Sequence, residues 1–197
     1  MDEAIEQDEL VELLAAGHRG ADSPVHPRNV MNSFYWKPSF KLDTEREEKY
    51  LSGMLDTVVG PENYPGDLTT SDNWPGVAPG LTGMNNALSS KYCNQRALVD
   101  LERKIPILWI RGADDQIVSD SSFFDFGMLG QLGLVPGWPG EDVFPPQPMV
   151  GQMRAVLEVY RERGGRFVES VLEDCGHGPH IEREADVLDL LRDWLSE

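Results

Sequence analysis

The chain has 197 residues, enough for one domain with a sizeable core, and its 40% hydrophobic and 26% charged residues are ordinary for a globular protein. With 34 acidic against 17 basic side chains its formal net charge is -17, which disfavours nucleic acid and anionic membrane surfaces as partners. The acidic N-terminus and the shortness of the longest apolar run, 105–110, predict neither a signal peptide nor a membrane span, and two cysteines without paired spacing favour a reducing, cytoplasmic compartment.

The first hundred residues are expected to form short helices. Apolar residues that precede Gly17 predict an amphipathic helix at the N-terminus. Thr44 and Glu47 form a capping box, and the apolar residues that follow predict a helix that ends at Gly60. Another short helix is predicted around 84–92.

Two proline-rich stretches, 21–40 and 60–83, separate these helices. The second is so rich in Gly, Pro, Asn and Asp that a long loop without regular structure is expected, and such loops are usually functional or linkers. Proline- and glycine-rich loops also carry three tryptophans, Trp36, Trp74 and Trp138. These side chains either line an apolar substrate pocket or anchor their loops by packing, and the sequence leaves both alternatives open.

From residue 105 onward the order strand, helix, strand, helix is typical of βαβ units, so the expected fold class is α/β with a parallel sheet. The run 105–110 is apolar without polar alternation, which predicts a strand buried on both faces. The other elements expected in this half are helices around 121–129 and over 149–160, a strand over 166–172 and a closing helix over 187–194.

An acid follows the first of these strands and a histidine follows the second. Asp115 and His177 both lie in loops after strand ends, and the carboxyl ends of neighbouring parallel strands meet at one edge of a sheet. The two side chains are therefore expected to converge. A carboxylate that accepts a hydrogen bond from one imidazole nitrogen fixes the tautomer and favours proton uptake at the other nitrogen, so the pair predicts a general base.

The segments "PILWIRGADDQIVSD" and "CGHGPHIER" resemble the acid-bearing strand and the histidine loop of the α/β-hydrolases. The family pattern Gly-x-x-Asp-x-Ile-Val selects Asp115 and leaves Asp114 as its neighbour. The pattern Gly-His-x-x-His selects His177, with His180 as a packing position. The resemblance implies a Ser-Asp-His hydrolase with a cap.

By this resemblance 1–100 is the helical, loop-rich cap segment and 101–197 is the C-terminal part of a partial α/β-hydrolase fold. The Gly-x-Ser-x-Gly turn that carries the family's nucleophile does not occur in the chain, so the serine is expected from a missing N-terminal half or from a second chain. Asp115 would orient the base His177 for a small ester-like or other acyl substrate, without cofactor or metal. The alternative is a non-catalytic, truncated remnant or an interaction module, inactive by itself.

Two other chemistries are compatible with the histidine loop. His177 and His180, with acidic residues nearby, form a possible metal pair, but a loop directs such ligands apart and no third histidine is close in sequence. Cys175 precedes His177 by two residues and suggests a thiol-imidazole pair. That arrangement conflicts with Asp115 behind the imidazole, and a buried structural thiol is the simpler interpretation.

Overall fold

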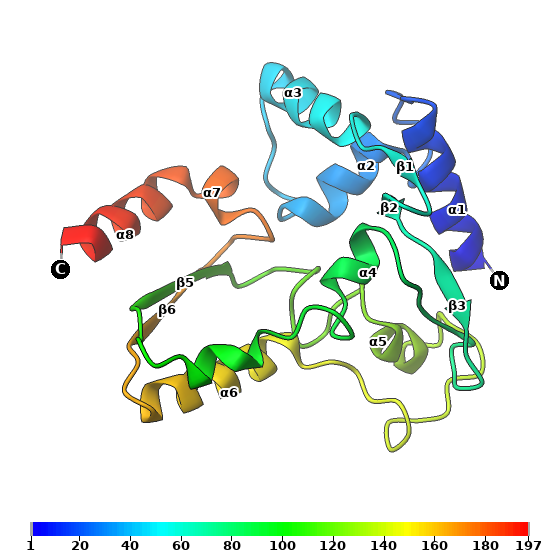
Figure 1. Ribbon diagram of the computed structural model, residues 1–197. Coiled ribbons are helices and arrows are strands. Elements are labelled where there is room, and N and C mark those ends of the chain that lie inside the picture. The colour runs from blue at the N-terminus through cyan, green and yellow to red at the C-terminus, as the bar shows by residue number, and fades with distance from the viewer. Residues whose placement is uncertain (1, 197) are drawn as a thin grey trace. The chain divides into compact units, whose positions relative to one another are not determined.

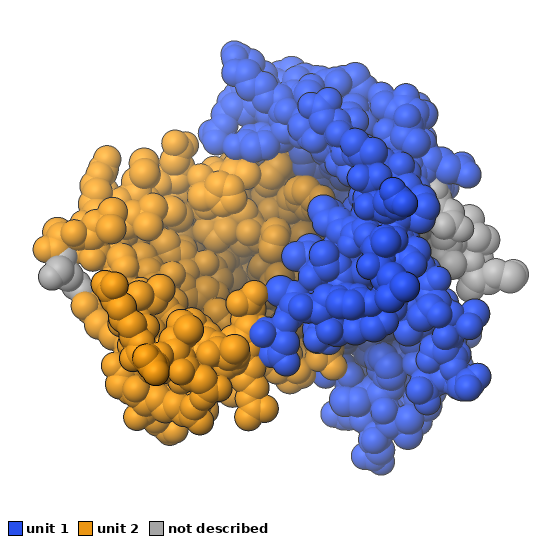
Figure 2. All heavy atoms as spheres, in the orientation of Figure 1, with its two compact units in different colours: residues 1–31, 41–94, 125–146 blue, residues 32–40, 95–124, 147–197 orange. Residues whose placement is uncertain are grey.

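The computed structural model describes the backbone of residues 2–196 and the side chains of residues 9–196 (Figure 1). These residues form two compact units, drawn in different colours in Figure 2. Unit 1 comprises 1–31, 41–94 and 125–146, and unit 2 comprises 32–40, 95–124 and 147–197. The units do not follow the segments 1–100 and 101–197, because each unit takes residues from both.

Unit 2 contains a parallel pair of six-residue strands, β5 (Ile107–Gly112) and β6 (Phe167–Leu172). The strands are in register from the Ile107–Phe167 pair to the Gly112–Leu172 pair. Helix α6 (Met149–Glu162) lies between them in sequence, so the strand, helix, strand order expected for this half is confirmed and the chain is α/β in this coarse sense.

Helix α6 forms because its apolar residues recur at helical spacing. Leu157 and Tyr160 are fully buried, and Gly164, with a φ of 88°, adopts the left-handed conformation just after the helix ends. The remaining helical segments whose residues all lie in unit 2 are η2 (Gln95–Asp100), α7 (Pro179–Glu182) and α8 (Glu184–Ser196). The closing helix expected over 187–194 corresponds to α8.

Strand β5 differs from its prediction in two ways. It begins at Ile107 rather than Ile105, and its first ladder bond joins the N–H of Ile107 to the carbonyl of Arg166 at 2.9 Å. The prediction of burial on both faces is wrong, because residues 107–111 are half-buried and β6 is the one strand that pairs with β5 within residues 2–196. Since parallel strands alternate their bonding direction, Leu108 and Ile110 point their N–H and carbonyl groups away from β6.

Unit 1 holds most of the short helices. One of them is capped differently from the prediction. The N–H of Arg46 donates to Asp43 Oδ1 at 2.9 Å, in place of the Thr44–Glu47 capping box. Asp125 caps the helix that begins at Phe126 in the same way, through the N–H of Met128. The helices are α1 (Asp2–Ala15), α2 (Pro27–Val30), α3 (Thr44–Leu55), α4 (Met84–Leu88) and α5 (Phe126–Gln131), and the π-helical turn Met31–Tyr35 follows α2.

The prediction that segment 60–83 is a loop without regular structure is wrong. It holds short strands in two pairs: β1 (Val59–Gly60) with β2 (Tyr64–Pro65), and β3 (Leu68–Thr70) with β4 (Val77–Pro79). Asp67 organises the second pair, because its Oδ1 accepts the N–H of Leu81 at 2.9 Å and that of Thr82 at 2.7 Å. A polar residue that suggested a loop is therefore what orders it.

No helix within residues 2–196 combines the length and the apolarity that a membrane crossing requires.

Candidate active site

Two loops of unit 2 meet where β5 and β6 end. The N–H of Ala113 donates to the carbonyl of Leu172, and the N–H of Asp114 to that of Cys175, each at 2.9 Å, so the pairing continues past the strands. A Cβ on Gly112 would lie 2.0 Å from the carbonyl oxygen of Gly176. Only glycine therefore permits this close approach of the histidine loop to the acid-bearing strand.

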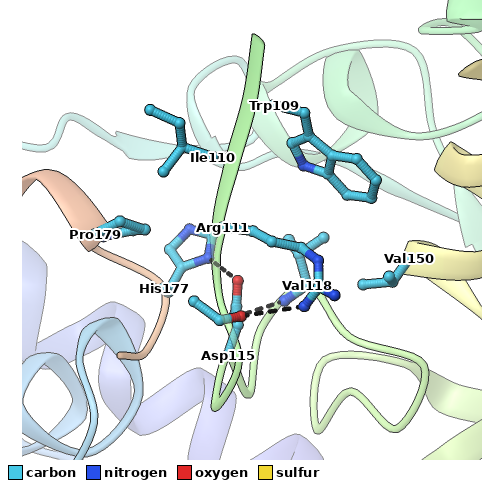
Figure 3. A pocket seen from close by; sticks show the side chains of 9 residues that line it. Trp109, Ile110, Arg111, Asp115, Val118, Val150, His177 and Pro179 are labelled. Carbon is cyan, nitrogen blue, oxygen red and sulfur yellow. Dashed lines mark hydrogen bonds and ion pairs between the residues drawn. The ribbon is translucent and has the colours of Figure 1, made fainter. Parts of the chain in front are cut away.

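Asp115 is held by the backbone of its own loop. Its Oδ1 accepts the N–H of Ile117 at 2.8 Å and the N–H of Val118 at 2.9 Å. Its side chain is 9% exposed. These bonds leave Oδ2 directed out of the loop, toward His177 (Figure 3).

His177 Nδ1 lies 2.9 Å from Asp115 Oδ2, so the convergence expected from the two strand-end loops is confirmed. The imidazole is 40% exposed. No group within the described part of the chain hydrogen-bonds to Nε2 of His177, which leaves that nitrogen available to exchange a proton. Such a pair, with one nitrogen fixed and the other accessible, is the arrangement of a general base.

The pKa values of the two residues follow from this contact. The hydrogen bond that His177 donates to Asp115 raises the pKa of His177 above its usual value, against the smaller, opposing effect of burial. For Asp115, burial by itself would raise the pKa, but the hydrogen bonds from His177, Val118 and Ile117 together outweigh it and hold the pKa below its usual value. The pair therefore favours an ionised carboxylate beside a readily protonated imidazole.

A hollow of about 190 Å³ opens beside the pair (Figure 3). Four consecutive residues of β5, 109–112, line it, and because successive strand residues face opposite ways, the hollow runs along the edge of β5 that β6 does not occupy. The sequence did not single out Trp109, Arg111 or Val150 as lining residues. For Trp109 and Arg111, their strand position just before the acid loop was the available signal; Val150 on α6 had none.

The tryptophans proposed from the sequence lie elsewhere. Trp36, in unit 2, is 2% exposed and donates from Nε1 to Asn32 Oδ1 at 3.1 Å. In unit 1, Trp74 Nε1 donates to the carbonyl of Pro136 and Trp138 Nε1 to that of Phe144, each at 2.9 Å. These contacts support the packing alternative, and a substrate-pocket role for the three residues stays a prediction.

The thiol-imidazole alternative has little support in the structure. Cys175 is fully buried, and this burial, with the neighbouring carboxylate of Glu182, raises the pKa of its thiol to about 12. A thiol with that pKa is protonated near neutral pH and is a poor nucleophile.

The metal alternative has no assembled ligand set. Within residues 9–196, whose side chains the structure describes, no three His, Cys, Asp or Glu residues are grouped closely enough to hold a metal ion. The carboxylate of Glu182 instead accepts hydrogen bonds from the backbone around His177.

No known protein family, curated protein or solved structure matches the chain at a significant level. The pair of strand-end loops and the contact that they create between Asp115 and His177 are therefore what indicates the function.

Proposed function

We propose that the chain is the acid- and histidine-bearing part of an α/β-hydrolase that acts on an ester-like or other small acyl substrate. One observation carries the proposal: Asp115 Oδ2 and His177 Nδ1 lie 2.9 Å apart at the carboxyl ends of paired parallel strands. The carboxylate keeps the proton of the neutral imidazole on Nδ1, so that Nε2 presents the basic lone pair.

In this proposal His177 transfers one proton in each half of the reaction. Nε2 takes the proton of a serine hydroxyl as the oxygen attacks the acyl carbon, and gives it to the leaving group as that bond breaks. In the second half of the reaction Nε2 takes a proton from water as the water oxygen attacks the acyl carbon, and gives it to the serine oxygen as the acyl–serine bond breaks and the acid product leaves. Asp115 stays ionised throughout and stabilises the imidazolium that forms in each half.

The serine comes, in this proposal, from a segment outside the 197 residues. The unpaired edge of β5 favours such a partner, because Leu108 and Ile110 direct backbone donors and acceptors away from β6. A strand that adds there in parallel ends beside Asp115 and His177. A nucleophile in the turn after that strand is then within reach of Nε2.

The test is co-expression of the chain with an N-terminal half of a related hydrolase that carries Gly-x-Ser-x-Gly. We expect the two chains to elute together from a size-exclusion column and to hydrolyse p-nitrophenyl acetate. His177→Ala and Asp115→Asn should each lower kcat/KM, by about 10³-fold or more. Asp193→Asn on α8 is the matched control, since it makes the same chemical change outside the two loops.

A non-catalytic interaction module is the second candidate, and the same unpaired edge of β5 favours it. It predicts a stable complex whose rate of hydrolysis does not change in His177→Ala. A hydrolysis rate independent of His177 would therefore defeat the hydrolase proposal, and a 197-residue chain that stays monomeric beside the added half would defeat both proposals.

A further inference from the structure

One carboxylate holds the backbone on both sides of His177. Glu182, the last residue of α7, accepts the N–H of Gly176 at 2.9 Å from Oε1 and 3.0 Å from Oε2, and the N–H of Gly178 at 3.2 Å from Oε1. Oε2 also accepts the N–H of Lys37 at 2.8 Å. Hydrogen bonds to an ionised acceptor are about twice as strong as neutral ones, so this residue fixes the path of the histidine loop.

The histidine loop also packs closely against the backbone of another segment, so it has no room to shift in that direction. A Cβ placed on Gly176 would lie 2.5 Å from the backbone nitrogen of Lys37 and 2.7 Å from the carbonyl carbon of Trp36. Segment 32–40, which we call the wall, therefore lies directly against the histidine loop through Trp36 and Lys37. The carboxylate of Glu182 bonds to both the wall and the loop. Both chain segments belong to unit 2.

The Lys37 side chain fastens the same wall to the loops on either side of the pair. Its Nζ lies 2.9 Å from Asp114 Oδ2 and 2.7 Å from Asp174 Oδ1. Asp114 adjoins Asp115 in sequence, and Asp174 follows β6. The backbone of Lys37 thus meets Glu182 while its ammonium group bridges the acid loop and the histidine loop.

We infer that Glu182 is a positioning residue for His177: it fixes the backbone on both sides of the imidazole so that Nδ1 meets Asp115. Glu182 touches no group that would react. It positions the imidazole through the loop, and its charge adds a smaller effect that favours the imidazolium. This inference rests on the proposed function only in treating His177 as the base. The contact between His177 and Asp115 is measurable in the chain by itself, so the two ideas can fail separately.

Several charged and titratable groups lie around the loop. The charge of Glu182 favours the imidazolium, as does that of Asp115. The others include Arg111 on β5, Lys37 and Tyr35 in the wall, Asp114 beside the acid, Asp174 before the loop and Arg183 after Glu182.

The experiment is an NMR titration of the histidine ring protons in the 197-residue chain, with His177→Ala to assign the signal of His177. Glu182→Gln removes the charge and replaces one acceptor oxygen by a donor, and Glu182→Ala removes both acceptors. We expect a lower titration midpoint for His177 in both variants than in the wild type, and loss of the low-field Nδ1 proton in Glu182→Ala. Glu162→Gln, an exposed Glu-to-Gln change at the end of α6, should leave both signals unchanged.

A merely structural role gives a different result. If Glu182→Ala lowers Tm but the folded protein keeps the low-field Nδ1 proton of His177, Glu182 stabilises the loop without positioning the imidazole, and the inference is overturned. A lower midpoint does not decide by itself, because loss of the Glu182 charge alone lowers it. An unchanged midpoint with unchanged Tm overturns it as well. Should Glu182→Ala fail to fold, the low-field Nδ1 proton in Glu182→Gln decides: its loss supports the inference and its retention overturns it. Hydrolysis by the two-chain complex plays no part in this readout, so failure of the proposed function shows separately.

Discussion

The hydroxyl of Tyr160 on α6 donates a hydrogen bond of 2.6 Å to the carbonyl of Ile105, two residues before β5 begins. The tyrosine ring is fully buried and packs on Gly165, where a Cβ would lie 2.1 Å from Cε1. This contact ties the C-terminal end of α6 to the start of the strand. It also uses a backbone acceptor that would otherwise be available to extend β5.

Tyr160→Phe removes that hydroxyl and leaves the ring in place. We expect the free energy of unfolding to fall by about 1–2 kcal/mol, because the variant loses a hydrogen bond in a buried setting. Urea denaturation followed by tryptophan fluorescence measures the change. Tyr35→Phe is the control, since the Tyr35 hydroxyl makes no hydrogen bond within the described residues, and an equal loss in both variants would contradict the role given to the Tyr160–Ile105 contact.

Two glycines should respond to alanine in opposite directions. Gly112→Ala places a methyl group against the carbonyl of Gly176 and should cost about 1–3 kcal/mol of stability, since backbone on both sides has to move. Gly53, exposed within α3, has open space where the Cβ would lie, so Gly53→Ala should stabilise the protein by about 0.5–1 kcal/mol. Thermal unfolding of the two variants beside the wild type tests the pair, and a harmless Gly112→Ala would show that the strand-end loops are not in close contact.

The contact between His177 and Asp115 should make stability depend on pH in a defined range. A raised pKa of His177 stabilises the folded state fully below its unfolded value of about 6.5, and this contribution is lost as the pH rises through the folded value. A lowered pKa of Asp115 stabilises the folded state above its unfolded value of about 3.9, and this is lost as the pH falls through the folded value. The pair is therefore worth most between about pH 4 and 6.5.

The measurement is urea denaturation of the wild type and of His177→Gln at pH 5.5 and at pH 8.5. We expect the free energy of unfolding of the wild type to exceed that of His177→Gln by more at pH 5.5 than at pH 8.5. In the Asp115→Asn background the pH dependence of this difference should shrink, because the imidazolium has lost its partner. If the difference between the wild type and His177→Gln does not change with pH while Asp115 is intact, the pairing is contradicted.

The two cysteines, neither of them in a disulfide, should react at different rates with a thiol reagent. Cys175 is buried and the pKa of its thiol is about 12, so at neutral pH its thiolate fraction is about 10³-fold below that of an ordinary thiol. Cys93 is half-buried. Titration of the folded chain with the reagent should modify Cys93 first. Cys175 should react only after denaturant has unfolded the chain. Cys93→Ser should then leave the folded chain almost unreactive, and rapid labelling of Cys175 in that variant would reopen the thiol-imidazole alternative.

Local patterns predicted the elements whose sequence periodicity is strong. The apolar spacing of α6 and the glycines after it located that helix, and the apolar run before Arg111 located β5 to within two residues. The same patterns placed Asp115 and His177 after neighbouring strand ends, which sufficed to predict their contact because parallel strands share an edge.

Contacts between distant residues account for what the sequence did not reveal. Asp67 orders the β3–β4 pair through the backbone of Leu81 and Thr82, and no periodic pattern signals such bonds. Lys37 is separated from Asp114 by 77 positions and from Asp174 by 137. Burial of β5 was overestimated because an apolar run shows only that burial of the strand is favourable. It does not show that other residues of the same chain pack on both of its faces.

Segment 32–40 lies in unit 2 although the residues on both sides of it, 1–31 and 41–94, lie in unit 1. Protease cleavage within 41–94 would therefore separate the histidine loop's wall from the rest of unit 2 in covalent terms, leaving Trp36 and Lys37 on the N-terminal fragment. A recombinant piece that starts near residue 100 would lack the N–H of Lys37, one of the three backbone N–H groups that Glu182 binds, and the ammonium group that bridges the two loops. Complementation of such a piece by a peptide spanning 32–40 would restore a surface that the chain builds from segments far apart in its sequence.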